Sequence, residues 1–280
     1  MSPSRCQAGA GFFHRAETMR IRSIAYALIL AAAVATPIRA QSTQSLRVFA
    51  SNGFRAVFDD LAPRCEKTIG RHLSTEFGTS TSLQQRVSGG EAFDVAVMTS
   101  EAIDDLMKAG KLTLSSLVPL GRSGIGIGIR TGTTKPDIKT PETLKQVLLD
   151  AKGITYAGDG ASRPHIESMM NALGITKAVA AKTALEQGSV RATANVASGR
   201  AEVLITLVSE ILPAPGVDLV GPLPARFQHY VSFAAATSAS TANGAESKSL
   251  IACLSGPDTL ATLKAKGMER TSNLEPRTSN

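Results

Sequence analysis

Four segments of the sequence place small hydroxyl or glycine residues between a short apolar strand and the expected start of a helix. They are Ser51-Asn52-Gly53, Thr79-Ser80-Thr81-Ser82, Gly158-Asp159-Gly160-Ala161-Ser162 and Gly188-Ser189. The first backbone N–H groups of a helix have no partner within the helix and carry a partial positive charge. Helix starts that converge and add hydroxyl donors therefore form an anion site without any lysine or arginine.

Each junction by itself is also compatible with an ordinary helix cap, because Ser and Thr are favoured N-cap residues. The segment Thr79–Ser82 is the most suggestive, since one helix start needs one cap and four hydroxyl residues stand in a row. Arg163 and His165 follow the third junction. An arginine there suits a carboxylate or phosphoester through two parallel hydrogen bonds, or it is a solvated loop charge.

Short apolar strands alternate with amphipathic helices along the chain from residue 46. Segments such as 46–50, 94–98 and 154–157 have the composition of buried strands, and each precedes a helical pattern. This alternation predicts right-handed βαβ units with ligands at the carboxyl ends of the strands. The glycines in Gly124–Gly128 follow the period of a strand, so they predict close approach of another backbone rather than a dinucleotide site.

The first 40 residues have the features of a leader. Arg20 and Arg22 follow Met19 and precede a short apolar core, and Ala40 is a small residue suited to signal peptidase. We therefore expect translation to start at Met19, with residues 1–18 upstream of it, and cleavage after Ala40. The apolar run of about a dozen residues is shorter than the roughly 20 that a membrane span needs.

Charge and histidine spacing exclude several classes of partner. The formal net charge is +7, but residues 1–40 hold five Lys/Arg and one Asp/Glu, which leaves +3 for residues 41–280. No cluster of basic and aromatic residues appears, so we expect no nucleic-acid partner. The four histidines lack metal-ligand spacing, and no metal or other cofactor is expected.

Two cysteines, Cys65 and Cys253, follow the expected cleavage point. An oxidising compartment permits a disulfide between them. Both also occupy apolar positions of expected helices, where free buried thiols are equally suitable.

Several segments resemble the periplasmic molybdate-binding proteins of ABC importers, which have the type II solute-binding fold. They are Val48-Phe49-Ala50-Ser51, Phe77-Gly78-Thr79-Ser80-Thr81-Ser82-Leu83, Phe93-Asp94-Val95-Ala96-Val97, Tyr156-Ala157-Gly158-Asp159, Ser255-Gly256-Pro257 and Leu263-Lys264-Ala265-Lys266-Gly267-Met268. Each segment alone is only modestly specific for this family, but the order and spacing of the segments behind a leader are more specific. The resemblance covers about residues 46–269.

The resemblance implies an α/β fold with two lobes, each a mainly parallel sheet flanked by helices, and a hinge between them. The first lobe would comprise 46–121 and 222–270, and the second lobe 122–221, with 271–280 as a flexible tail. The lobes would close on the ligand around the hinge.

The resemblance also implies a set of ligand-binding residues. Ser51 and Ser80 fall where serines of the family hydrogen-bond the oxyanion, and backbone amides near His165 and Val190 would complete the site. Asn52, Thr79, Thr81 and Arg163 join these four as candidates. The sequence departs from the family at Met98-Thr99-Ser100-Glu101 and in lacking a tyrosine near Thr206 and Leu207.

The function expected from this resemblance is the periplasmic binding component of an ABC importer, exported by a Sec-type signal. Its partners would be a molybdate-like oxyanion, such as molybdate or tungstate, and the transporter permease, and it would act as a monomer. Alternatives are an organic anion, carboxylate or phosphoester, as ligand, or a sensor partner that presents its ligand to a receptor. No nucleophile elbow, Cys/His pair or telling carboxylate pair appears, so we expect no enzyme; Asp159 is expected to be a turn or cap residue.

Overall fold

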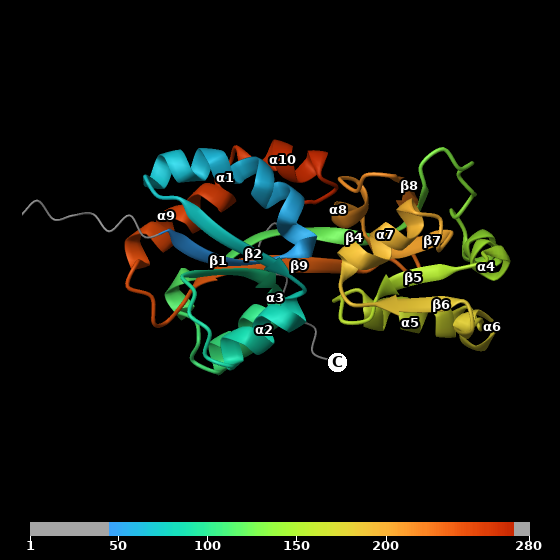
Figure 1. Cartoon of the computed structure of the whole chain (residues 1–280), viewed down its shortest axis with the longest axis horizontal. Helices are drawn as coiled ribbons and strands as arrows, with labels where there is room; N and C mark the ends of the chain where they lie inside the picture. The colour runs from blue at the N-terminus through green and yellow to red at the C-terminus, as the bar shows by residue number, and fades with distance from the viewer. Residues whose placement is uncertain (1–44, 272–280) are drawn as a thin grey trace, which may run out of the picture. The chain divides into compact units, whose positions relative to one another are not determined.

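The computed structural model describes residues 45–271 (Figure 1). The expected start at Met19, the cleavage after Ala40 and the tail from residue 272 lie outside the described residues. Among residues 45–271, no helix combines the length and apolar character that a membrane crossing requires.

The strands form one connected sheet with the order β2-β1-β3-β9-β4-β7-β5-β6, and β8 also pairs with β4. Their bounds are β1 Leu46–Ser51, β2 Leu73–Gly78, β3 Val95–Thr99, β4 Val118–Arg130, β5 Ile154–Ala157, β6 Thr183–Glu186, β7 Val203–Leu207, β8 Val217–Pro222 and β9 Tyr230–Thr237.

The helices of the described residues include two short 3-10 turns, η1 Asn52–Phe54 and η2 Leu114–Ser116. The α-helices are α1 Arg55–Ile69, α2 Ser80–Ser88, α3 Ser100–Lys108, α4 Pro141–Asp150, α5 Arg163–Ala172, α6 Thr176–Ala180, α7 Ser189–Ala197, α8 Val208–Ile211, α9 Gly244–Ser255 and α10 Thr259–Ala265.

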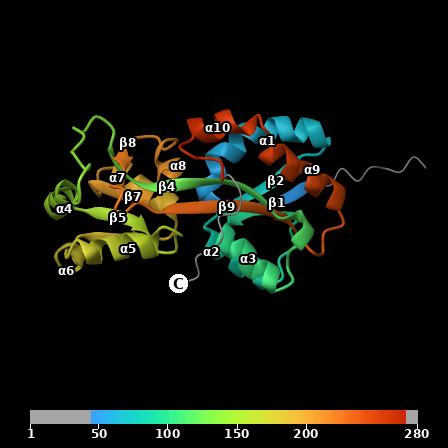
Figure 2. The same cartoon turned by 180° about the vertical axis from the view of Figure 1, so that it is seen from behind.

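Strand β4 links the two halves of the sheet. Its residues 118–124 pair with β9, whereas residues 125–130 pair with β7 and β8. We call the strands on the β9 side the first sheet half and those on the β7 side the second sheet half. Figure 2 shows β4 and β9 as long neighbouring strands that extend from one half toward the other.

The expected α/β class is confirmed, with a mixed rather than mainly parallel sheet. Strands β1, β2 and β3 pair in parallel, as do β5, β6 and β7. The pairings of β9 with β3 and of β4 with β7, β8 and β9 are antiparallel. The reason is that β4 carries the chain toward the second half and β9 carries it back.

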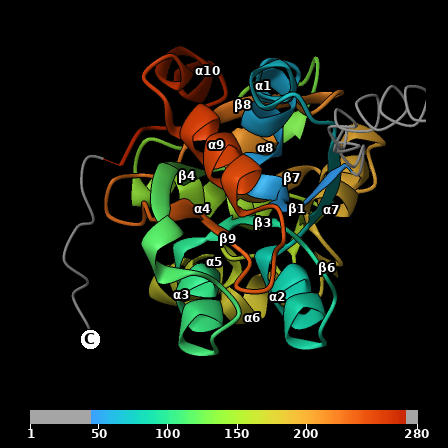
Figure 3. The same cartoon turned by 90° about the vertical axis from the view of Figure 1, so that its left-hand side faces the viewer.

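Helices cover both faces of the first sheet half. Helices α1, α9 and α10 lie over one face, and α2 and α3 lie over the other (Figure 3). Helix α1 buries Val57, Phe58 and Leu61 because these residues recur at helical spacing, and Gly70 ends it in the left-handed conformation. The lobe boundaries near 121 and 221 stay a prediction, since the described residues cluster as one compact unit.

Four elements between residues 176 and 222 were not expected from the sequence, namely α6, β6, α8 and β8. Strand β6 pairs only with β5, and its residues are partly or fully exposed, so it lacks the apolar pattern of a buried strand. Helix α8 has four residues, which is too short for a helical period to appear.

The glycines of β4 allow α8 and β8 to approach closely, which confirms their expected role. A Cβ atom at Gly126 would lie 3.0 Å from the Gly221 carbonyl oxygen and 3.0 Å from a methyl carbon of Val208. A Cβ atom at Gly128 would lie 2.9 Å from Val217. Side chains on this face of β4 would therefore push α8 away from the sheet.

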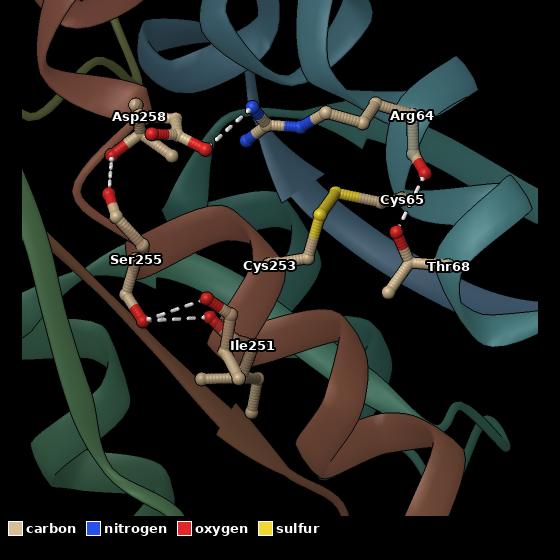
Figure 4. Close-up of a disulfide and its surroundings, with 10 residues drawn as sticks. Arg64, Cys65, Thr68, Ile251, Cys253, Ser255 and Asp258 are labelled. Atoms are coloured by element: carbon tan, nitrogen blue, oxygen red, sulfur yellow. Dashed lines mark hydrogen bonds and ion pairs between the residues drawn. A yellow bond between two sulfur atoms is a disulfide. The ribbon is translucent and has the colours of Figure 1, made fainter.

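A disulfide joins Cys65 of α1 to Cys253 of α9, with Cα atoms 5.8 Å apart (Figure 4). The bond closes a segment of 188 residues that contains the whole second sheet half. Arg64 lies beside it and forms an ion pair of 3.5 Å with Asp258, which precedes α10. The sequence was compatible with either a disulfide or two free thiols, and the structure contains the disulfide.

Removing the disulfide is expected to destabilise the protein. A cross-link across a segment of this length restricts the unfolded chain, so the variant Cys65→Ala/Cys253→Ala should lose about 2–5 kcal/mol of unfolding free energy. Urea unfolding in oxidising buffer measures the difference. A reductant should produce the same loss in the unmodified protein and none in the variant, and equal midpoints for both proteins would contradict a structural bridge.

Candidate functional site

A small cavity of about 20 Å³ lies where the carboxyl ends of strands from both sheet halves meet. Polar residues supply much of its lining, including Ser51, Asn52, Thr79, Ser80, Thr99, Ser162, Ser189, Thr206 and Glu210; Phe233 and Leu207 add apolar walls. The four junctions singled out in the sequence thus contribute to one cavity. Starts of α2 and α7 are among them, so unpaired backbone N–H groups and hydroxyls gather there.

The side chains of Ser51 and Ser80 lie in the wall of the cavity, and their role in anion binding stays a prediction. Ser80 Oγ accepts a hydrogen bond of 3.0 Å from the backbone N–H of Thr99, which leaves its own hydrogen free to donate. Ser51 precedes η1 but does not cap it with its side chain. Both side chains are buried at the cavity wall.

Asp159 joins three of the junctions across the cleft. Its Oδ2 accepts a hydrogen bond of 2.9 Å from Thr79 Oγ1, and its Oδ1 accepts one of 2.8 Å from the backbone N–H of Gly188. Thr79 follows β2 in the first sheet half, whereas Asp159 and Gly188 follow β5 and β6 in the second. The Asp159 carboxylate therefore ties the two halves together beside the cavity.

Glu210 is the one carboxylate that lines the cavity. Its Oε1 accepts a hydrogen bond of 2.7 Å from Ser189 Oγ, and its Oε2 accepts one from Thr206 Oγ1. It stands in α8, directly after β7, and Ser209 beside it donates a hydrogen bond of 2.7 Å to the carbonyl of Gly53. The neighbouring contacts thus fix α8 against the first sheet half.

The protein environment makes Glu210 a weaker acid than usual. Desolvation by the surrounding protein raises the pKa of its carboxyl, and the hydrogen bonds from Thr206, Ser189 and the Leu207 backbone oppose that rise in part. The residue as a whole keeps some exposed surface, on the side away from the small cavity. A carboxyl of raised pKa in a cavity wall is suited to accept and return protons.

The structure brings four of the eight candidate residues to the cavity: Ser51, Asn52, Thr79 and Ser80. Thr81 is exposed on α2, and Val190 is 58% exposed and lines a second, larger cavity. Arg163 donates to the Gly158 carbonyl at 2.7 Å and pairs with Glu167 at 2.7 Å, so its charge is already engaged outside the cavity lining.

Sequence reasoning missed Glu210 and Thr206 as site residues. The available signal was a glutamate three residues beyond the end of an apolar strand, within Thr206-Leu207-Val208-Ser209-Glu210. The third residue of a helix is often Glu, because it completes a capping box there. Here Glu210 holds that position in α8 and also lines the cavity. Over residues 45–271, three or more His, Cys, Asp or Glu side chains do not gather in a way that could hold a metal ion.

His165 stacks on His229 rather than lining the cavity. The ring centroids are 3.3 Å apart and the ring planes are 12° from parallel. Desolvation lowers the pKa of both imidazoles, His229 lowers that of His165 further, and the Glu101 carboxylate opposes the shift at His229. The neutral pair is favoured, because two charged rings at this distance would repel each other.

The stacked pair predicts that stability falls in mild acid. Below the ordinary histidine pKa of about 6.5 the unfolded chain binds protons that the folded pair resists, so unfolding free energy decreases from about pH 7 downward through the lowered folded pKa values. In the variant His165→Gln/His229→Gln, unfolding free energy should fall less between pH 7 and pH 5, because up to two fewer protons bind on unfolding. Urea titrations at both pH values measure the difference. The exposed His72→Gln is the matched control, and an unchanged pH dependence in the double variant would contradict the assignment.

Comparison with known proteins gives relatives that cover nearly the whole chain. Aconitate isomerase of a Pseudomonas species is 27% identical over 257 residues, which are 89% of this chain and 97% of that protein. The periplasmic molybdate-binding protein of Azotobacter vinelandii superposes with a TM-score of 0.69 at 19% identity, over 83% of this chain and all of that one. PEB3 of Campylobacter jejuni, solved with L-phospholactate, gives a TM-score of 0.62 at 18% identity, over 81% of this chain and all of that one.

These findings correct one expectation. The absence of familiar catalytic motifs led to the prediction that the chain is not an enzyme, and the relative named aconitate isomerase contradicts it. The prediction was wrong because it rested only on the lack of nucleophile motifs and carboxylate pairs in the sequence. Proton transfer needs only one suitably placed acid–base group, and such a group leaves no spacing pattern in a sequence.

The fold and the sequence lead to the same family. The fold is shared with a periplasmic molybdate-binding protein and with L-phospholactate-bound PEB3, which supports the fold and leaves the ligand open. The family model described as bacterial extracellular solute-binding protein matches residues 46–269. The chain therefore belongs to the bacterial extracellular solute-binding protein family.

Proposed function

We propose that this protein binds a small unsaturated polycarboxylate such as aconitate outside the cytoplasm and shifts a proton on it. The observation that carries the proposal is Glu210, a carboxyl of raised pKa in the wall of a cavity whose other polar lining residues are neutral. The likeness to an aconitate isomerase supports the substrate class.

The reaction needs one proton removed and one returned. Aconitate carries a methylene group next to its carbon–carbon double bond. Glu210 takes a methylene proton, the electron pair of that C–H bond forms a new double bond, and the former double bond accepts the proton at its far carbon. The step is redox-neutral, and it interconverts the geometric isomers because the carbon skeleton is the same read from either end.

The donors of the cavity fit the charge that develops in this step. Removing the methylene proton spreads negative charge onto a carboxylate, where hydroxyl and backbone N–H donors stabilise it. Ser80 and the start of α2 lie on one side of the cavity, and the first backbone N–H groups of α7 lie on the other, since the Ser189 hydroxyl already donates to Glu210. The same donors that hold a carboxylate therefore stabilise its enolate form.

Simple capture of a small oxyanion for an ABC importer is a second candidate function. The hydroxyl and backbone N–H donors around the small cavity suit a compact anion such as molybdate or tungstate. In this version the protein is a periplasmic monomer, exported by the leader at residues 1–40, that delivers its ligand to a permease or presents it to a sensor. Glu210 would then have no chemical role, so it separates the two candidates.

Replacing Glu210 tests the proposed proton transfer. The variant Glu210→Gln keeps the size of the side chain and one accepting oxygen but cannot accept the proton, so kcat/KM for trans-aconitate should fall by about 10²–10⁴-fold while binding persists. Proton NMR in D₂O measures both the appearance of cis-aconitate and deuterium uptake at the methylene carbon.

The matched control is Glu202→Gln, an exposed glutamate just before β7, whereas Glu210 follows the other end of that strand. Activity should be unchanged in this variant. Thr206→Val gives a second readout, because loss of its hydrogen bond raises the Glu210 pKa and should move the acid limb of kcat/KM to higher pH. An unmodified protein that binds molybdate and leaves aconitate unchanged would favour simple capture instead.

A further inference from the structure

A second cavity of about 500 Å³ adjoins the small one. It lies between the first turns of α1, which contribute Arg55 and Asp59, and the helices α7 and α8 with the segment that follows. Its volume falls within the range of about 300–1,000 Å³ typical of sites for small organic ligands. Most of its wall is apolar, supplied by alanines, prolines and Val190.

Three residues belong to the walls of both cavities: Asn52, Ser189 and Glu210. The exposed surface that Glu210 retains is consistent with this position between the two spaces. The two cavities are therefore neighbours, with Glu210 in the wall of each. The proton-transferring carboxyl thus lies where the middle of an elongated ligand would be.

The two cavities differ in size, and each suits a different part of a polycarboxylate. A volume of about 20 Å³ accepts a group about as large as one or two water molecules, which suits a single carboxylate head. A six-carbon tricarboxylate needs further space for its chain and its remaining carboxylates. The adjoining cavity is the space that Glu210 can also reach.

The larger cavity contains a cation for those carboxylates. The Arg55 guanidinium lies 4.5 Å from the centre of the Phe77 ring, and its Nε is 3.5 Å from Asp59 Oδ2. Both side chains of this pair are about half exposed, and such pairs contribute little stability. Arg55 is therefore available to turn toward an anionic ligand, with Asp59 as its competitor.

We propose that the two cavities form one divided site for an elongated polycarboxylate, with one carboxylate in the small cavity, the others in the larger cavity near Arg55, and Glu210 between them. This inference rests on the proposed function and extends it to substrate specificity. It distinguishes tricarboxylates from compact oxyanions, which would occupy only the small cavity.

Titration calorimetry with two probes, trans-aconitate and molybdate, tests the divided site in the whole mature chain. Arg55→Gln should weaken trans-aconitate binding about tenfold, as expected for loss of one charge-assisted contact. Asp59→Asn should tighten it, because the competitor of Arg55 loses its charge. Ala194→Trp, which fills the larger cavity from α7, should weaken it at least tenfold. None of the three should change molybdate binding by more than about twofold.

The matched control is Arg64→Gln, on the same helix but outside both cavities, which should leave both probes unaffected. The divided site is overturned if the unmodified protein does not bind trans-aconitate. It is also overturned if Arg55→Gln and Ala194→Trp bind trans-aconitate normally, or if they weaken both probes equally. Normal binding of trans-aconitate with no Glu210-dependent proton exchange would instead overturn the proposed isomerisation, so the two failures are distinguishable.

Discussion

The hydrogen bonds of the Asp159 carboxylate hold together the ends of strands that belong to different halves of the sheet. One oxygen binds the Thr79 hydroxyl and the other binds the Gly188 N–H. Because the same threonine caps α2 and Gly188 precedes α7, this single side chain fixes two helix starts relative to each other. The meeting of these helix starts at one cavity depends on that arrangement, and a helix start attracts an anion only over a short distance.

A balance of opposing effects determines the chemistry of Glu210. Burial among protein groups favours the protonated carboxyl, while the hydroxyls of Ser189 and Thr206 favour the carboxylate and fix its direction. A site built only to capture an anion gains nothing from a carboxylate in its wall, because like charges repel. The presence of Glu210 among neutral donors is therefore the feature that argues for proton transfer, and the glycines of β4 make it possible by admitting α8 close to the sheet.

The family shows how one scaffold serves several ligands. Related structures were solved as molybdate-binding, sulfate-binding and phospholactate-bound proteins at 18–19% identity, so their shared sheet does not choose the ligand. In this chain the hydroxyl donors remain, whereas Asn52, Glu210 and Arg55 bring an amide, an acid–base group and a cation to two adjoining cavities. Differences at a few side chains on a constant frame are sufficient to change the function that a fold serves.

The sequence by itself determined the α/β class, the succession of most strands and helices and the hydroxyl-rich junctions, because these depend on local periodicity and capping. Ser51 and Ser80 were singled out at these junctions, at the end of β1 and the start of α2, and the structure places both in the cavity wall. Tertiary structure decided the antiparallel pairings of β4 and β9, the stacking of His165 on His229 and the disulfide, which join residues distant in the chain. It also decided that Glu210 lines the cavity and Arg163 does not, because the direction of a side chain in a short helix or loop depends on packing that no spacing pattern records.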